Sequence, residues 1–208
     1  HGGSMVQASR EPAQVFPQSR DPKDLELTDR FYEEMFGTWG QFPGGGIGAD
    51  EWARTGHTDP RQGVESCQIV EIMRSHGMLL DITGNSAWAD RCEEAAFNSL
   101  PVTMTPEARG VEYWNPANMV AKDAKTKFPA YDDTDLPFYS TTSMNHRCCL
   151  HNLGFAWPTF TRNLWAATPG NGLAARMYAP CVVEAKAGPE GDAVRIVETT
   201  DYPFKESV

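Results

Sequence analysis

The sequence has no apolar run as long as the roughly 20 residues that a membrane-spanning helix requires. Its opening, His1 to Met5, is not followed by the charged and apolar regions of a secretory signal peptide. We therefore expect a soluble protein with no membrane partner. No targeting region is visible, so the sequence leaves the cytoplasm, the periplasm and secretion from a bacterium open.

Basic residues are scarce. The 208-residue chain has 18 Lys and Arg against 28 Asp and Glu, a formal net charge of -10. An acidic surface repels nucleic acids and anionic membranes, so we expect neither as a partner. It suits a neutral or weakly charged substrate, although solubility alone would also account for it.

The sequence also lacks the Cys-x-x-Cys pairs of common zinc sites, although it has five cysteines. Cys148 and Cys149 are adjacent, and adjacent residues hold their Cβ atoms badly for a mutual disulfide. They are therefore a metal-binding pair, two free thiols, or partners of distant cysteines. With Cys67 and the nearby carboxylate Glu65 they would fill a tetrahedral zinc shell. The alternative is a set of buried free thiols, the state in which unpaired cysteine is most often found.

Three segments have the periodicity of amphipathic helices. The first begins at Asp21-Pro22, an N-cap followed by proline at the first helical position, and should end at Gly37. The second covers about residues 67–83 and the third about 87–100, with a Gly-Asn-Ser break between them. Recurrent helix hairpins of this kind indicate an α/α toroid or solenoid.

The character of the chain changes after Trp165. A Gly-Asn-Gly turn at 170–172 precedes three short strands, expected at about 173–178, 181–186 and 193–199. Residues 101–142 are rich in proline and aspartate, and should mix short strands with long loops. Cys92, on the apolar face of the third helix, and Cys181, in a strand, are expected to be core thiols.

Four motifs occur in a characteristic order: a glycine-rich segment that ends in Asp50-Glu51, then Glu65-Ser66-Cys67, Tyr113-Trp114-Asn115-Pro116, and Cys148-Cys149 followed by Asn152. Together they resemble glycoside hydrolase family 127, the zinc-dependent β-L-arabinofuranosidases and their relatives. The resemblance implies that residues 1–168 are the later part of an (α/α)6 toroid. Residues 169–208 would then begin a β-sandwich, with the rest of the polypeptide missing from this chain.

The resemblance also implies the catalytic residues. Zn2+ would be held by Glu65, Cys67, Cys148 and Cys149, and Cys148 would also be the nucleophile. Glu51 would be the general acid/base, with Asp50 as the second candidate. From the residues alone, the favoured interpretation of Glu51 is a solvated loop carboxylate beside Asp50, and only the resemblance favours the acid/base role. Glu65 could instead be an acid stabilised by the dipole at a helix N-terminus.

Substrate contacts are implied for Tyr113 and His1. We add Trp52 and Trp114 as candidates for stacking on a sugar, although tryptophans in a toroid more often pack in the core. Tyr113 reads equally as a buried strand aromatic. His1 is interpreted as native, because the family has a similar His-Gly or His-Ala opening, with a tag remnant as the alternative.

His151 and Asn152 are candidates for orienting the metal ligands through hydrogen bonds, without binding the metal themselves. The family tends to have prolines between the cysteine pair and this asparagine, whereas this chain has Leu-His. This departure suggests another branch of the family and leaves the sugar specificity open.

The function implied is a retaining glycoside hydrolase that acts on a furanose-type non-reducing end, such as β-L-arabinofuranose. One alternative is a carbohydrate-binding or structural fragment with an inert zinc site. Another is a metal-free toroid lyase or epimerase that uses Glu51, Tyr113 and His151. A partial toroid would expose apolar helix faces, so we also expect the chain to associate into oligomers.

Overall fold

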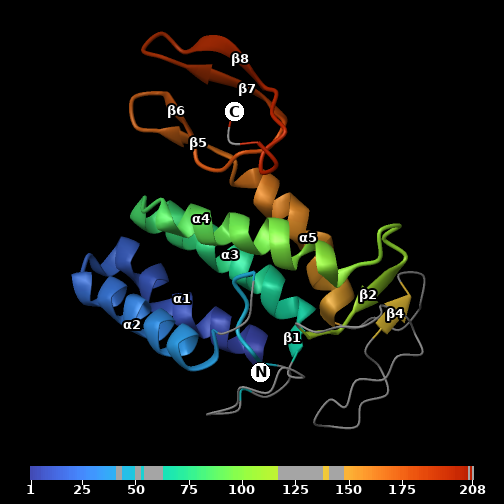
Figure 1. The fold of residues 1–208 in the computed structure, drawn as a ribbon. Coiled ribbons are helices and arrows are strands. Elements are labelled where there is room, and N and C mark those ends of the chain that lie inside the picture. Colours follow the sequence, from blue (N-terminus) through green and yellow to red (C-terminus); the bar gives the residue numbers. More distant parts are fainter. Residues whose placement is uncertain are drawn as a thin grey trace.

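The computed structural model describes residues 1–40, 44–49, 53, 63–116, 138–140, 148–205 and 207. These residues form five α-helices, two short helical turns of other kinds and eight short strands (Figure 1). In chain order they are α1 (Gly2–Ser19), α2 (Pro22–Trp39), β1 (Gly63–Glu65), α3 (Ser66–Thr83), α4 (Ala87–Glu94), a π-helical turn (Ala95–Ser99), a 3-10 turn (Pro101–Thr103), β2 (Gly110–Glu112), β3 (Trp114–Pro116), β4 (Phe138–Ser140), α5 (Cys148–Arg162), β5 (Trp165–Thr168), β6 (Gly172–Ala175), β7 (Cys181–Ala187) and β8 (Asp192–Glu198).

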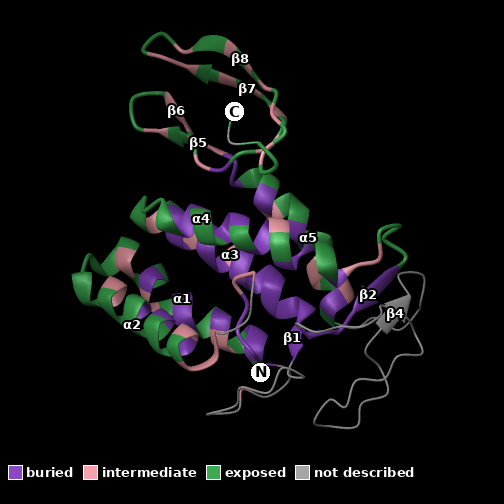
Figure 2. Cartoon of the chain, viewed as in Figure 1, coloured by how far each residue is buried: buried purple, intermediate pink, exposed green. Residues whose placement is uncertain are grey.

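Helix α3 is the centre of the fold. It contacts α1, α4 and α5, while α2 packs mainly on α1. Most of its residues are buried, and Figure 2 shows it as the most continuously buried helix. The apolar residues Ile69, Val70, Ile72 and Met73 project from several sides of the helix, so burying all of them requires neighbours on several sides.

Helix α1 was not expected, because Pro12 and Pro17 lie inside it and proline removes a helical hydrogen bond. Its face of small and apolar residues, including Val6 and Ala13, packs in the core. The Ala13 N–H also donates to Thr28 Oγ1 of α2 at 2.9 Å. Tertiary packing therefore supplies the stability that the local sequence lacks.

Helix α2 begins as predicted: the Asp21 side chain accepts a hydrogen bond from the Lys23 N–H at 3.0 Å, and proline follows it. Its predicted end at Gly37 is wrong. That glycine is not among those with a positive φ, and the helix continues to Trp39, where the N–H of Gly40 bonds to the Phe36 carbonyl.

The second and third predicted helices are confirmed as α3 and α4, with one difference. The segment from residue 87 to 100 is α-helical only to Glu94 and continues as a π-helical turn at Ala95–Ser99.

Among the described residues, no helix is both long and apolar enough to cross a membrane.

The four strands after residue 164 form two hairpins, β5 with β6 and β7 with β8, above α4 and α5 in Figure 1. The three predicted strands correspond to β6, β7 and β8, although β6 ends at Ala175 rather than near 178; β5 was not predicted. Gly170 and Asn171 have φ values of 77° and 59°, which is the left-handed geometry that the turn needs. In β7 and β8 the paired Val182 and Val197 are each 53% exposed.

A buried histidine lies in the middle of α3. His76 is 1% exposed, and its ring centroid lies 5.6 Å from that of Tyr32 and 5.4 Å from that of Trp88. Burial, together with the positive charge of Arg91, lowers its pKa from 6.5 to about 3. The folded protein therefore keeps this imidazole neutral at pH values where the unfolded chain would protonate it.

We predict that His76 makes the fold sensitive to acid. Between pH 6.5 and 3 the unfolded chain binds a proton that the folded chain does not, so stability falls as pH is lowered through this window. The effect is about 5 kcal/mol across it. In His76→Leu, the free energy of unfolding measured with urea should fall less steeply over the same range. Parallel pH profiles for the variant and the wild type would contradict this.

Candidate metal centre

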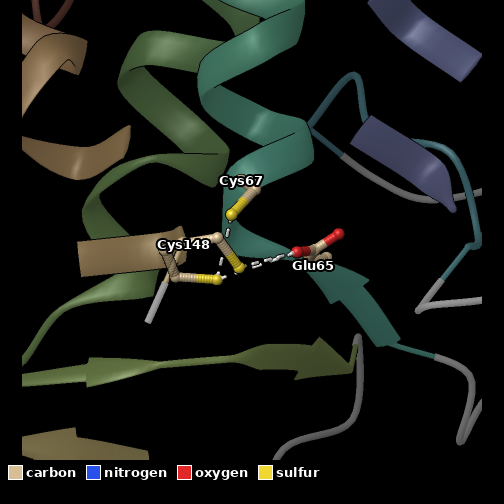
Figure 3. Close-up of side chains that lie close together, drawn as sticks. Glu65, Cys67 and Cys148 are labelled. Atoms are coloured by element: carbon tan, nitrogen blue, oxygen red, sulfur yellow. Dashed lines mark hydrogen bonds between the residues drawn. The ribbon is translucent and has the colours of Figure 1, made fainter. Parts of the chain in front are cut away.

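Four side chains meet where β1, α3 and α5 come together (Figure 3). The ligand-type atoms of Glu65, Cys67, Cys148 and Cys149 all lie within 4.8 Å of one another. The Cys67 and Cys149 sulfur atoms are 3.3 Å apart. Glu65 Oε1 lies 3.6 Å from the Cys148 sulfur and 3.9 Å from the Cys149 sulfur. The sequence-predicted ligand set is therefore brought together from positions more than 80 residues apart.

Glu65 and Cys67 face one point because the backbone changes conformation between them. Glu65 is the last residue of β1 and is extended, with φ -68° and ψ 134°, whereas Ser66 begins α3. Strand β1 pairs with β3 so that Glu65 lies opposite Trp114. The change from strand to helix therefore directs the Glu65 carboxylate and the Cys67 sulfur toward the same cluster.

Hydrogen bonds hold that change of conformation in place. The Ser66 N–H donates to the Tyr113 carbonyl at 3.1 Å, and the Ser66 hydroxyl donates to the Glu112 carbonyl at 2.5 Å. The Asn115 side-chain amide donates to the Val64 carbonyl and to the Ser66 hydroxyl, at 3.2 and 2.9 Å. Sequence reasoning gave Ser66 and Asn115 no role, although both lie inside the motifs that it singled out.

Three helices begin at this cluster. Cys148 and Cys149 are the first residues of α5, Cys67 is the second residue of α3, and His1 is the N-cap of α1 and contacts Glu65. A helix N-terminus carries roughly half a positive charge, which stabilises thiolates and carboxylates beside it. The backbone therefore favours the anionic forms of the side chains, which are the forms that bind a metal.

Burial differs among the four side chains. Glu65, Cys67 and Cys149 are at most 2% exposed, whereas Cys148 is exposed. Without a metal ion, hydrogen bonds from the Cys149 and Cys67 thiols lower the pKa of Cys148 to about 2. The same contacts, together with burial, raise the pKa of Cys67 and of Cys149. These contacts therefore favour the thiolate at the sulfur that solvent can reach over the two buried ones.

The spacing fits a tetrahedral metal ion. With metal–sulfur bonds of about 2.3 Å, sulfur atoms in a tetrahedral shell lie roughly 3.8 Å apart. With a metal–oxygen bond of about 2.0 Å, a sulfur and an oxygen of the same shell lie roughly 3.5 Å apart. The two distances from Glu65 Oε1 to sulfur, 3.6 and 3.9 Å, are near that value, whereas the Cys67–Cys149 sulfur separation of 3.3 Å is shorter than the sulfur–sulfur value. Three thiolates and one carboxylate are the donor set of zinc and of other divalent ions that prefer sulfur, and not of magnesium or calcium.

The glycine-rich segment is tied to the same helix start. Gln68, next to Cys67, accepts a hydrogen bond from the Ile47 N–H at 2.9 Å and donates to the Ala49 carbonyl at 3.2 Å. Ala49 also pairs with Ala53. Gln68 is fully buried and was missed by sequence reasoning, since nothing distinguishes it there from any other helical glutamine. The candidates Asp50, Glu51 and Trp52 lie outside the described residues.

The aromatic candidates lie beside the cluster. Tyr113 and Trp114 are 7% and 4% exposed, and their rings meet edge to face at 4.3 Å. Both pack in a small apolar cluster with Cys67 and Cys149. A packing role accounts for both, and contact of either ring with a sugar stays a prediction.

The polar candidates come from two helices: His1 is the N-cap of α1, and His151 and Asn152 lie on α5. His1 was predicted to contact substrate, but its Nε2 lies 3.1 Å from Glu65 Oε2. His151 and Asn152 follow the cysteines on the first turns of α5, where His151 is exposed and Asn152 is half-buried. Their expected role in orienting the ligands stays a prediction.

Residues 3–162 match a family model described as the catalytic domain of β-L-arabinofuranosidases of glycoside hydrolase family 127. The chain is therefore part of a glycoside hydrolase catalytic domain. It belongs to family 127, as the ordered motifs implied. No curated protein matches the chain.

The fold is similar to solved structures of that family. One is a family 127 β-arabinofuranosidase, with a TM-score of 0.74 and 17% identity over 98% of this chain and 30% of that one. A β-L-arabinofuranosidase from Geobacillus stearothermophilus T6 gives 0.76 and 16%, over 98% and 32%. A glycoside hydrolase gives 0.75 and 14%, over 98% and 36%. The chain spans about a third of the length of each.

We predict that the cluster binds one divalent transition-metal ion per chain. Cobalt(II) should give the intense near-ultraviolet absorption of thiolate coordination, and Cys67→Ser should weaken cobalt and zinc binding at least about tenfold. Cys181→Ser, on β7 and outside the cluster, is the matched control and should bind as the wild type does. Equal binding by both variants would mean that this cluster is not the site.

Proposed function

We propose that the chain forms part of a retaining glycoside hydrolase that removes a furanose residue, such as β-L-arabinofuranose, from a non-reducing end. Zn2+ would be held by Glu65, Cys67, Cys148 and Cys149. The observation that carries the proposal is the gathering of these four ligand atoms within 4.8 Å in a chain of family 127. A metal-free lyase or epimerase gives no reason for such a cluster.

Cys148 is the proposed nucleophile because it is the exposed member of the cluster. A bound zinc ion would hold the thiols deprotonated at neutral pH, so that no separate base is needed to generate the thiolate. The Cys148 sulfur would attack the anomeric carbon and form a thioglycosyl bond as the bond to the leaving oxygen breaks. Buried Cys67 and Cys149 cannot meet a substrate in this way and would serve only as ligands.

Glu51 is the proposed general acid/base. It would donate a proton to the departing oxygen and then take one from the water that displaces the Cys148 sulfur. Two displacements at one carbon retain its configuration. Glu51 follows Ala49 by two residues, and Gln68 fixes Ala49 beside the start of α3, so the sequence position suits a role at this cluster.

The larger architecture is part of the same proposal. Residues 1–168 would be part of an α/α toroid. The packing of α1 on α2 and of α3 on α4 supports this, because a toroid is built from such helix pairs. Residues 169–208 would belong to a β-sandwich, to which the hairpins after α5 would contribute strands. The chain spans about a third of the similar structures. The second candidate function is therefore a metal-binding segment that is not catalytic by itself. Turnover decides between these two functions.

We predict that Cys148→Ser abolishes hydrolysis of an aryl β-L-arabinofuranoside, with kcat reduced at least about a thousandfold. Zinc should still bind through the remaining ligands, with weaker affinity. Metal content and kcat, measured on the same preparation, separate loss of the nucleophile from loss of the metal. A Cys148→Ser protein that turns over substrate at the wild-type rate would exclude the nucleophile role. Wild-type protein with zinc and no turnover would favour the inert site.

We also predict that Glu51→Gln slows hydrolysis most for poor leaving groups, since these need protonation to depart. With an activated aryl glycoside, azide should restore turnover by displacing the Cys148 sulfur without general-base help, and the product should be a glycosyl azide of retained configuration. Asp50→Asn is the matched control and should respond little to azide. Azide rescue confined to Asp50→Asn would transfer the role to Asp50.

A further inference from the structure

His1 is held on two sides. Its Nδ1 accepts a hydrogen bond from the Ser4 N–H at 3.3 Å, which makes it the N-cap of α1. Its Nε2 lies 3.1 Å from Glu65 Oε2, and its side chain is 36% exposed whereas that of Glu65 is fully buried. The imidazole thus connects the end of one helix to a proposed metal ligand on another segment.

The capping contact fixes the arrangement of protons on the ring. A nitrogen that accepts a hydrogen bond from a backbone N–H carries no proton of its own, so Nδ1 is the bare nitrogen. The proton of a neutral imidazole then lies on Nε2. The protonated Nε2 then lies 3.1 Å from Glu65 Oε2, a buried oxygen, so one tautomer is compatible with both contacts.

The two oxygens of Glu65 then have different surroundings. Oε2 faces the His1 ring, whereas Oε1 faces the sulfur atoms of Cys148 and Cys149, at 3.6 and 3.9 Å. We propose that His1 is a positioning residue that keeps Glu65 as a one-oxygen ligand through Oε1. Four-coordination needs such a restraint, because a carboxylate that binds through both oxygens would raise the coordination number to five.

The surroundings of His1 are built for close approach. A Cβ at Gly2 would lie 2.3 Å from Gln68 Nε2 and 3.0 Å from the Ala49 carbonyl, and a Cβ at Gly3 would lie 3.2 Å from the His1 ring. The two glycines let the first turn of α1 dock against the start of α3. The packing of α1 along α3 then sets the distance between the imidazole and Glu65.

This inference rests on the proposed metal site and differs from the substrate contact that the sequence suggested for His1. Because Nδ1 caps α1 and Nε2 faces Glu65 Oε2 at 3.1 Å, a sugar hydroxyl would have to compete with one of these contacts. Hydrogen bonds to ligating groups commonly change metal affinity 10–100-fold when removed. The expected effect of losing His1 is therefore on the metal, and not on the Michaelis constant.

Two substitutions separate the capping contact from the contact with Glu65. In His1→Asn, the shorter amide can still cap α1 but cannot reach Glu65. In His1→Gln, the terminal amide lies near the place of Nε2 and can donate to Glu65, while glutamine is a poor N-cap. Ala13→Gly is the control, since it weakens α1 away from the site.

The measurement is zinc affinity by chelator competition, with the cobalt(II) spectrum as a second readout and thermal unfolding of the metal-free protein as a check on the fold. We expect His1→Asn to lose about 10–100-fold in zinc affinity and to alter the cobalt bands. We expect His1→Gln to stay within about threefold of the wild type, and Ala13→Gly to unfold at a lower temperature without loss of affinity.

The opposite order, with the asparagine variant normal and the glutamine variant impaired, would assign His1 to helix capping alone. Unchanged zinc affinity in both, with a raised Michaelis constant, would restore the substrate contact and overturn the inference. A wild-type protein that binds no metal would instead overturn the metal site itself. The failure of the inference and the failure of the proposed function are therefore distinguishable.

Discussion

The site depends on the meeting of three helix N-termini at one group of acidic side chains. Three thiolates and a carboxylate carry four negative charges when all are deprotonated, and a divalent ion would neutralise two of them. The starts of α1, α3 and α5 supply part of the remaining compensation, since each aligned backbone contributes a partial positive charge at this end. The central position of α3, buried against α1 and α5, is what brings these termini together.

The three cysteines of the cluster differ in exposure and therefore in the pKa of their thiols. Hydrogen bonds with Cys148, together with burial, raise the pKa of the Cys67 and Cys149 thiols, whereas hydrogen bonds from them lower the pKa of the exposed Cys148. Burial and hydrogen bonding, rather than any difference in residue type, distinguish one cysteine from its neighbour. The same asymmetry gives the proposed mechanism its division between two structural thiolates and one that can react.

Much of this could be predicted from the sequence, for identifiable reasons. The Asp21-Pro22 helix start depends on local chemistry, and α3 on an apolar pattern, so both could be read directly. The ligand set could be predicted because Glu65, Cys67 and the cysteine pair occur in a characteristic order. Helix α1 could not, because its prolines argue against a helix and only contacts with α2 and α3 outweigh them. The roles of Gln68 and His1 arise from residues distant in the chain, and no local pattern encodes them.

The close approach of α1 to Gln68 has a consequence for how sequences of this kind can diverge. Any side chain at residue 2 would collide with the Gln68 amide, and that amide also fixes the backbone at residues 47 and 49. Residues 2 and 68 are therefore coupled. A relative with alanine after the histidine needs a shifted or shorter residue 68, or a helix α1 that lies further from α3. The glycine-rich segment up to Ala49 and the start of α3 should consequently change together, so covariation across these positions would record the geometry of the site.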